Sequence, residues 1–109
     1  MKFEILIGPE DGQVRTFSED EVTIGRQFSE NLFTIAGDGF VSKKHATVRC
    51  EGRNFTLADV GNDGAGNTHG THVKDQSLRT KAHLKGEQVA LEAGDIFIVG
   101  ITWVRFLGE

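Results

Sequence analysis

Short runs in which hydrophobic and polar residues alternate follow one another along the chain. Phe3, Ile5 and Ile7 are separated by single residues, and Val22 and Ile24 repeat the pattern after an acidic turn. A period of two places the hydrophobic side chains on one face of a β-strand. Runs of this kind predict strands at residues 3–7, 14–17, 22–24, 46–50, 55–58, 83–84, 88–91, 95–99 and 102–106.

Turn-forming residues separate these runs. Residues 8–12, 51–54 and the glycine-rich stretch 61–67 have the composition of turns and loops, and residues 28–32 predict one short helical turn with Ser29 as its cap. Many short strands with turn signals about every eight to twelve residues are typical of an all-β sandwich or barrel. The chain therefore predicts an all-β fold.

The length of 109 residues fits one domain, with its core over about residues 3–106, either alone or as part of a longer protein. No apolar run approaches the length of a membrane span, and the first residues do not resemble a signal peptide. We expect the lone Cys50 to be a small core residue and the protein to be cytoplasmic. Trp103 and Phe106 are both predicted to be core aromatics.

Charge narrows the choice of partner. Twelve basic and sixteen acidic residues give a net charge of −4, which disfavours the many phosphate contacts of nucleic-acid binding. A local site for one phosphate group is still possible, because Arg26, Lys43 and Lys44 can form a positive spot on an acidic surface.

Four short patches fall at turns between the predicted strands. In order, they are Gly25-Arg26, the stretch Ser42-Lys43-Lys44-His45, Gly70-Thr71 and Gly94-Asp95. Arginine offers a planar fork of donors that matches phosphate oxygens, and a serine hydroxyl adds a compact donor. The patches therefore suggest an oxyanion site displayed on loops.

The order and context of these patches resemble the forkhead-associated (FHA) domain, a module that binds phosphothreonine, over about residues 3–106. The resemblance implies a β-sandwich of two antiparallel sheets with about eleven strands and ligand loops at one end. It also implies a phosphothreonine segment of a partner protein, or of the parent chain, as ligand for a monomeric domain. No cofactor, nucleic acid or membrane is expected.

The resemblance also assigns roles to individual residues. It makes Arg26 and Ser42 phosphate ligands, with Lys43 as an auxiliary contact and Thr68 near the ligand. Four further residues are assigned to the structure of the motif, with His45 bracing the loop by hydrogen bonds: Gly25, His45, Gly70 and Thr71. The Gly94-Asp95 patch is expected to be a hairpin turn of the scaffold.

One segment departs from the family pattern, which runs aspartate-x-glycine-serine-x-asparagine-glycine-threonine. Here five residues, 62–66, are inserted after Gly61, and His69 stands where the family has the asparagine that contacts the peptide backbone. An amide presents a donor and an acceptor side by side, whereas the two nitrogens of imidazole lie at different ring positions. We expect His69 to face the peptide backbone and to replace one of the two hydrogen bonds.

Other functions are less well supported by the sequence. Ser42 and His45 could act as nucleophile and base, but no nucleophile elbow or third orienting group is evident. His69 and His72 lack the paired ligands of known zinc sites, so no metal is expected. The sequence thus predicts a non-catalytic phosphopeptide-binding module in Ser/Thr kinase signalling. The alternative is an FHA scaffold that binds proteins independently of phosphate.

Overall fold

The computed structural model describes the backbone of residues 1–109 and every side chain except that of Glu30. Its regular elements are eleven strands and one 3-10 helix. They are β1 (Lys2–Ile7), β2 (Val14–Thr16), β3 (Glu21–Gly25), η1 (Phe28–Glu30), β4 (Phe33–Thr34), β5 (Ala46–Glu51), β6 (Asn54–Asp59), β7 (Thr71–Lys74), β8 (Thr80–Leu84), β9 (Gln88–Leu91), β10 (Ile96–Val99) and β11 (Thr102–Gly108). Nowhere in the described chain is there a helix long and apolar enough to cross a membrane.

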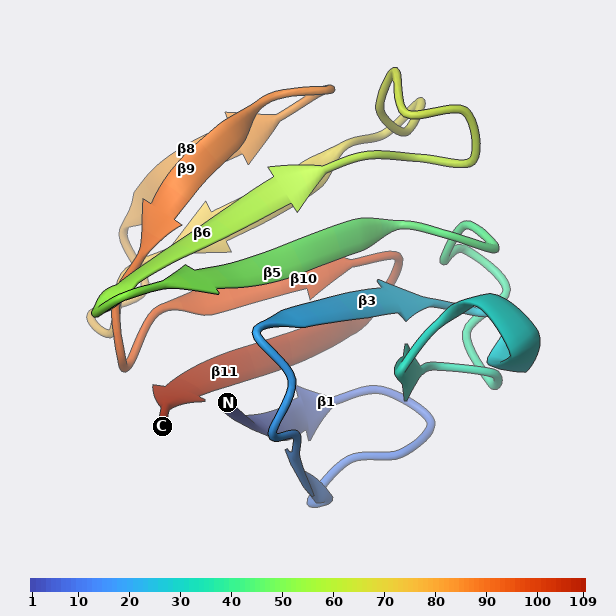
Figure 1. Cartoon of the computed structure of the whole chain (residues 1–109). Coiled ribbons are helices and arrows are strands. Elements are labelled where there is room, and N and C mark those ends of the chain that lie inside the picture. The colour runs from blue at the N-terminus through green and yellow to red at the C-terminus, as the bar shows by residue number, and fades with distance from the viewer.

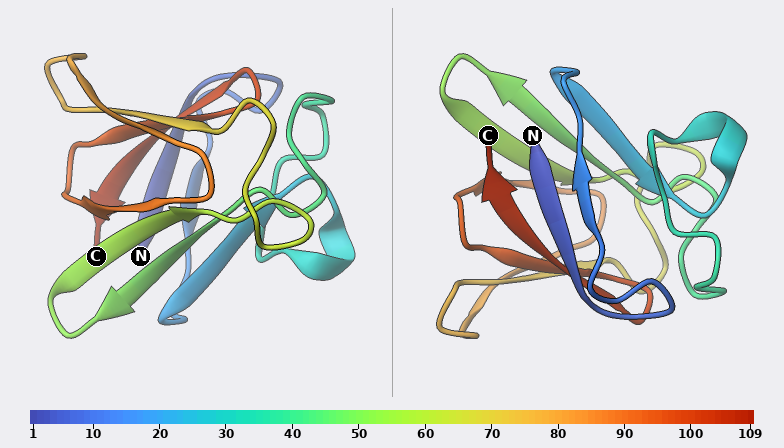
Figure 2. Two further views of the ribbon diagram at one scale, coloured as in Figure 1. Left: turned by 90° about the horizontal axis from the view of Figure 1, so that it is seen from above. Right: turned by 90° about the horizontal axis from the view of Figure 1, so that it is seen from below.

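The strands form two sheets that pack face to face (Figures 1 and 2). One sheet has the order β2-β1-β11-β10-β7-β8, and the other has the order β4-β3-β5-β6-β9. The predicted sandwich is confirmed. One short pairing departs from the antiparallel expectation. The chain reverses through η1, and β4 runs parallel to β3, with Ile24 beside Phe33.

The space between the sheets is filled by the inward-facing residues of both. Phe3 lies at its centre, with ring centroids 5.3 Å from Phe33 and 5.5 Å from Phe106. Phe106 is a core residue as predicted, but the prediction for Trp103 is wrong. Positions 103 and 106 differ by an odd number, so they lie on opposite faces of β11, and Trp103 is only partly buried on the outer face.

Two smaller expectations also fail. Cys50 is only half-buried, because it lies near the end of β5, where its thiol donates to the carbonyl of Gly52. The predicted helical turn exists as η1, but Gln27 is the residue that precedes it, and no side chain caps it. Ser29 lies inside the turn, where its hydroxyl accepts a hydrogen bond from the Gln27 amide.

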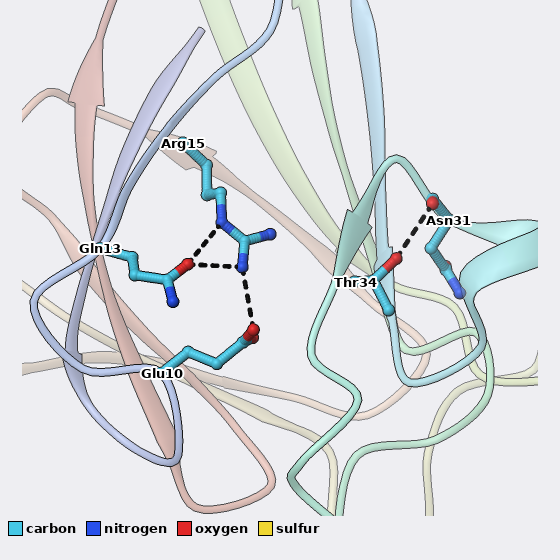
Figure 3. A network of polar contacts seen from close by, with 5 residues as sticks. All are labelled: Glu10, Gln13, Arg15, Asn31 and Thr34. Carbon is cyan, nitrogen blue, oxygen red and sulfur yellow. Dashed lines mark hydrogen bonds and ion pairs between the residues drawn. The ribbon is translucent and has the colours of Figure 1, made fainter.

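The turn between β1 and β2 is tied down by Arg15 (Figure 3). The guanidinium of Arg15 donates to Gln13 Oε1 at 2.8 and 3.0 Å and to Glu10 Oε1 at 3.1 Å. Its Cζ atom also lies 5.6 Å from the ring centroid of Phe33 on β4. The turn is therefore anchored beside the segment that follows η1.

The loops that carry the predicted site gather at one end of the sandwich, on the right in Figure 1. They are the segment after β3, the loop before β5 and the loop between β6 and β7. The two termini lie away from this end, next to each other, because Lys2 pairs with Gly108. A chain continuing from either terminus would not have to cross these loops.

Candidate functional site

Arg26 follows β3 directly and is exposed. Its backbone N–H donates to the carbonyl of Ser42 at 3.0 Å, and its Nε donates to the carbonyl of Val41 at 3.1 Å. The two terminal nitrogens of its guanidinium meet no acceptor among the groups that the structure describes. Arg26 is thus fixed at Nε and presents its outer donors to solvent beside Ser42.

Gly25 brings the two loops together. A Cβ atom at this position would lie 2.3 Å from the carbonyl oxygen of Lys43 and 2.6 Å from Nδ2 of Asn31. Asn31 is itself buried, and its amide donates to the carbonyls of Lys43 and Gln27 at 2.6 and 2.7 Å. Only glycine lets the end of β3 lie this close to the Ser42 loop.

The hydroxyl of the half-buried Ser42 donates to Asn67 Oδ1 at 2.5 Å. The orientation of the Asn67 amide follows from its other contacts, since Nδ2 donates to the carbonyl of His45 at 2.8 Å and to Asp59 Oδ1. Two acceptors on one side require the amide nitrogen there, so the oxygen faces Ser42. Asn67 therefore holds the hydroxyl proton of Ser42.

His45 is buried between the same two loops. Its Nδ1 accepts from the backbone N–H of Ser42 at 3.1 Å, and its Nε2 lies 3.3 Å from the carbonyl of Gly70, which assigns the proton to Nε2. Burial lowers the pKa of His45, and the contact with Gly70 and the charge of Asp59 oppose that effect only in part. The ring contacts the backbone of Ser42 and not its hydroxyl, so the pair lacks the geometry of a nucleophile and its base.

Asp59, at the end of β6, is the buried acceptor for the neighbouring turns. Its carboxylate accepts from Thr71 Oγ1 at 2.7 Å, from the Gly86 N–H at 2.8 Å and from the Asn67 N–H at 3.1 Å, in addition to the Asn67 amide. Burial alone would raise the pKa of Asp59, but these hydrogen bonds outweigh it and lower the pKa below its usual value. The ionised carboxylate thus fixes the Gly70-Thr71 turn.

The inserted residues 62–66 form a loop whose ends meet. The N–H of Gly66 donates to the carbonyl of Val60 at 2.7 Å, and a Cβ atom at Gly61 would lie 2.3 Å from the Gly66 oxygen. Asn62 Oδ1 also accepts from the backbone N–H of Lys44 at 3.0 Å. The two ends of the 62–66 loop therefore lie next to each other. The chain continues at Asn67, and Thr68 and His69 after it are exposed.

These loops border a cleft of about 410 Å³. Its lining combines residues of the two loops with His72 of β7 and with residues of β10 and the turn after it: Phe40, Ser42, His45, Asn67, Thr68, His69, Gly70, His72, Ile98, Gly100 and Ile101. The buried Asp38 joins the walls, since it accepts from the N–H groups of Phe40 and Ile101, each at 2.9 Å, and from Thr102 Oγ1 at 2.7 Å. Its carboxylate thus ties the loop before β5 to the β10–β11 turn.

Two of the four sequence patches contribute to this lining, with Ser42 and His45 from one and Gly70 from the other. The Gly25-Arg26 patch adjoins them, because the Arg26 N–H donates to the carbonyl of Ser42. The fourth, Gly94-Asp95, lies in the turn between β9 and β10, where the Asp95 carboxylate pairs with Lys81 Nζ at 2.6 Å. Lys43 is exposed next to Ser42. Among the predicted residues, Arg26, Ser42, Lys43, Thr68 and His69 are all at the loop end, while Gly25, His45, Gly70 and Thr71 support them from within.

Sequence reasoning missed three residues that position the site: Asn31, Asp38 and Asn67. Asn67 stands at the serine position of the quoted family pattern, which was an available signal. Asp38 lies between two glycines in a loop and resembles an ordinary turn residue. The contacts by which they join separate loops, with Lys43, Ser42 and Thr102, span 12 to 64 residues along the chain, so no local pattern reveals them.

The protein-family model of the FHA domain matches residues 22–100, and the chain therefore belongs to the FHA domain family. No curated protein matches the chain significantly in sequence. The family prediction made from the four patches is confirmed.

Solved structures agree with this fold. The FHA domain of the CT664 protein from Chlamydia trachomatis has a TM-score of 0.75 and 15% identity over 95% of this chain and 92% of that chain. An FHA domain from a structural and functional analysis of phosphothreonine-dependent FHA domain interactions has a TM-score of 0.68 and 22% identity over 95% of this chain and 91% of that chain. Mycobacterium tuberculosis EmbR, in complex with a low-affinity phosphopeptide, has a TM-score of 0.73 and 18% identity over 98% of this chain and 24% of that chain.

The buried, neutral His45 predicts a pH-dependent stability. The unfolded chain takes up a proton on this residue near pH 6.5, whereas the folded chain resists it, so the free energy of unfolding should fall as the pH drops below 6.5. His45→Gln should remove this part of the slope, at most about 1.4 kcal/mol per pH unit, and lower stability at pH 7.5 by about 1–3 kcal/mol.

Urea unfolding of both proteins between pH 5.0 and 7.5 measures the difference. His72, whose pKa is also lowered by burial and by the nearby charges of His83, Lys74 and Lys85, contributes equally to both curves and cancels. Parallel curves for the parent and the variant would contradict a buried neutral role for His45.

Proposed function

We propose that this chain is a phosphothreonine-peptide recognition module that mediates phosphorylation-dependent protein–protein interaction in Ser/Thr kinase signalling. The observation that carries the proposal is the exposed guanidinium of Arg26, held at Nε by the carbonyl of Val41, the residue that precedes Ser42. Arginine paired with a hydroxyl donor suits a phosphate dianion, because charge-assisted hydrogen bonds are about twice as strong as neutral ones.

In this proposal Arg26 and Ser42 hold the phosphate, and Lys43 and Thr68 add further contacts from the exposed rim. His69 faces the backbone of the bound peptide. The Ser42 hydroxyl has one proton, which it gives to Asn67 in the free protein. On binding, the Ser42 hydroxyl therefore has to turn from Asn67 to the phosphate. A neutral hydrogen bond is then replaced by a charge-assisted one.

The support from relatives concerns the kind of ligand. EmbR was solved with a phosphopeptide, and another similar FHA domain was studied for its phosphothreonine-dependent interactions. We propose a ligand of the same class here, in a partner protein or in the parent chain. The module in this proposal is one monomeric, non-catalytic domain over residues 1–109, located in the cytoplasm and independent of any cofactor.

A second candidate function is a phosphate-independent protein scaffold. It is favoured by His69 at the position where the family has asparagine, by the inserted loop 62–66, and by the exposed Phe28 and Phe40. Such a scaffold would bind partners through shape and apolar contact, so phosphorylation would not matter. Paired peptides with threonine and phosphothreonine at one position separate the two functions.

Arg26→Ala should abolish most phosphopeptide affinity with little effect on the melting temperature. Removing one partner of a buried or partly buried charged pair commonly costs about 2–5 kcal/mol, and about 1.4 kcal/mol is tenfold in affinity. Isothermal titration calorimetry with members of a phosphothreonine peptide library measures the loss. Arg53→Ala is the matched control, since Arg53 is exposed in the turn between β5 and β6, away from the site.

Binding of Arg26→Ala within about threefold of the parent would remove Arg26 from the phosphate site. Equal affinity of the parent for phosphorylated and unphosphorylated peptides would favour the scaffold function instead.

His69→Asn should tighten phosphopeptide binding by about two- to tenfold, because an amide can donate and accept together at one peptide edge. The measurement is isothermal titration calorimetry of the parent and the variant with the same phosphothreonine peptide. Equal affinities of the two proteins would show that His69 does not face the ligand.

A further inference from the structure

The outer face of the six-stranded sheet carries a row of side chains next to the cleft. The strand registers place His83 opposite His72, His72 opposite Ile98, and Ile98 opposite Trp103. All four are exposed or only partly buried, whereas the residues directly before and after each of them in its strand are buried or packed against the core. The rings of His72 and His83 stack with their centroids 3.8 Å apart, and Lys74 Nζ lies 5.9 Å from the ring centroid of Trp103.

This face is basic in an acidic protein. Three lysines lie on or directly after β7 and β8, namely Lys74, Lys81 and Lys85, while the whole chain has a net charge of −4. The carboxylate of Glu87 adjoins them, since it accepts from the Lys85 N–H at 3.4 Å. Lys81 is paired with Asp95, but Lys85 is exposed and close enough to His72 to lower its pKa, together with His83 and Lys74. Lys74 and Lys85 therefore offer positive charge to an anionic group at this face.

The row continues directly from the candidate site. His72 and Ile98 line the same cleft as Ser42, Thr68 and His69. Neighbouring strands lie about 4.8 Å apart, so the three steps from His83 to Trp103 span roughly 14 Å, which is the length of about four extended residues. A peptide anchored at the loops can thus reach this face within one short segment.

We propose that the outer face of β8, β7, β10 and β11 is a second contact surface, occupied by an acidic segment of the same partner chain that carries the phosphothreonine. Carboxylates of this segment contact Lys74, Lys85, His72 and His83, and its aliphatic groups cover Ile98 and Trp103. This inference rests on the proposed function for its anchor, and it adds a preference in the partner's sequence.

The test uses matched phosphothreonine peptides that extend about eight residues on either side of the phosphothreonine. Two acidic peptides contain four Asp or Glu residues, one before the phosphothreonine and the other after it. The reference peptide has Asn and Gln at those positions. One acidic peptide should bind about three- to tenfold more tightly than the reference, because several exposed charge pairs each add a little. The advantage should shrink as NaCl is raised from 50 to 500 mM.

Two double variants test whether the tighter binding of the acidic peptide arises at this face. The double variant Lys74→Gln/Lys85→Gln should lose the advantage of the acidic peptide and keep its affinity for the reference peptide. The control Arg49→Gln/Arg53→Gln removes the same charge from the other sheet and should keep the advantage. Melting temperatures of both variants verify that they fold.

A pH series adds a readout for the histidines. The charged and titratable groups that face His72 are His83 on β8, Lys74 on β7 and Lys85 after β8, while β10 presents Ile98. Burial and these basic neighbours lower the pKa of His72, so His72 gains its charge below pH 6.5 and the ratio of acidic to reference affinity should rise as the pH falls from 6.5 to about 5. His72→Gln/His83→Gln should flatten the rise.

Equal binding of the acidic and reference peptides would overturn this inference but leave the proposed function intact. An equal loss of the advantage in both double variants would also overturn it, since the effect would then come from net charge alone. Tighter binding of a single-stranded oligonucleotide than of the acidic peptide, lost in Lys74→Gln/Lys85→Gln, would assign the face to nucleic acid. If no phosphothreonine peptide binds more tightly than its unphosphorylated form, the proposed function itself is refuted instead.

Discussion

The arrangement of the loop end depends on one buried carboxylate. Asp59 accepts hydrogen bonds from the backbone N–H groups of Asn67 and Gly86, from the hydroxyl of Thr71 and from the amide of Asn67. A buried charge is costly unless it is well solvated by donors, and these four contacts supply that solvation. Through Asn67, the same carboxylate supports Ser42, which lies 25 residues before Asn67 in the sequence. Loss of its charge would therefore free several turns together.

The loops are held by specific contacts more than by hydrophobic burial. Asp38, Asn31 and His45 each join segments that the strands alone would leave independent, and Gly25 permits a backbone approach that no other residue allows. Such contacts fix the exposed Arg26 and the half-buried Ser42 in the free protein. A site that is already ordered loses less conformational entropy on binding, and this is the main physical advantage of placing recognition loops on a rigid sandwich.

The sequence predicts the scaffold well and the supporting contacts poorly. Alternation of apolar residues locates most strands and the sandwich, because burial of one face imposes a period of two. It fails for Trp103, whose size suggested the core although its parity with Phe106 placed it outside, and for Cys50 at a strand end. The motif places Arg26, Ser42 and Thr68 at the loop end, and their role in binding stays a prediction, whereas Asn67 and Asp38 act through partners distant in sequence.

The central claim is that phosphate binds at the loop end between Arg26 and Ser42. The most direct test is a ¹H–¹⁵N NMR titration of the chain with a phosphothreonine peptide and its unphosphorylated form. The account predicts that the phosphopeptide alone shifts the backbone amides of Arg26, Ser42 and Thr68, together with the Nε–H signal of Arg26. Shifts confined to the opposite end of the sandwich, around Gly52 and Arg53, or the same shifts with both peptides, would contradict it.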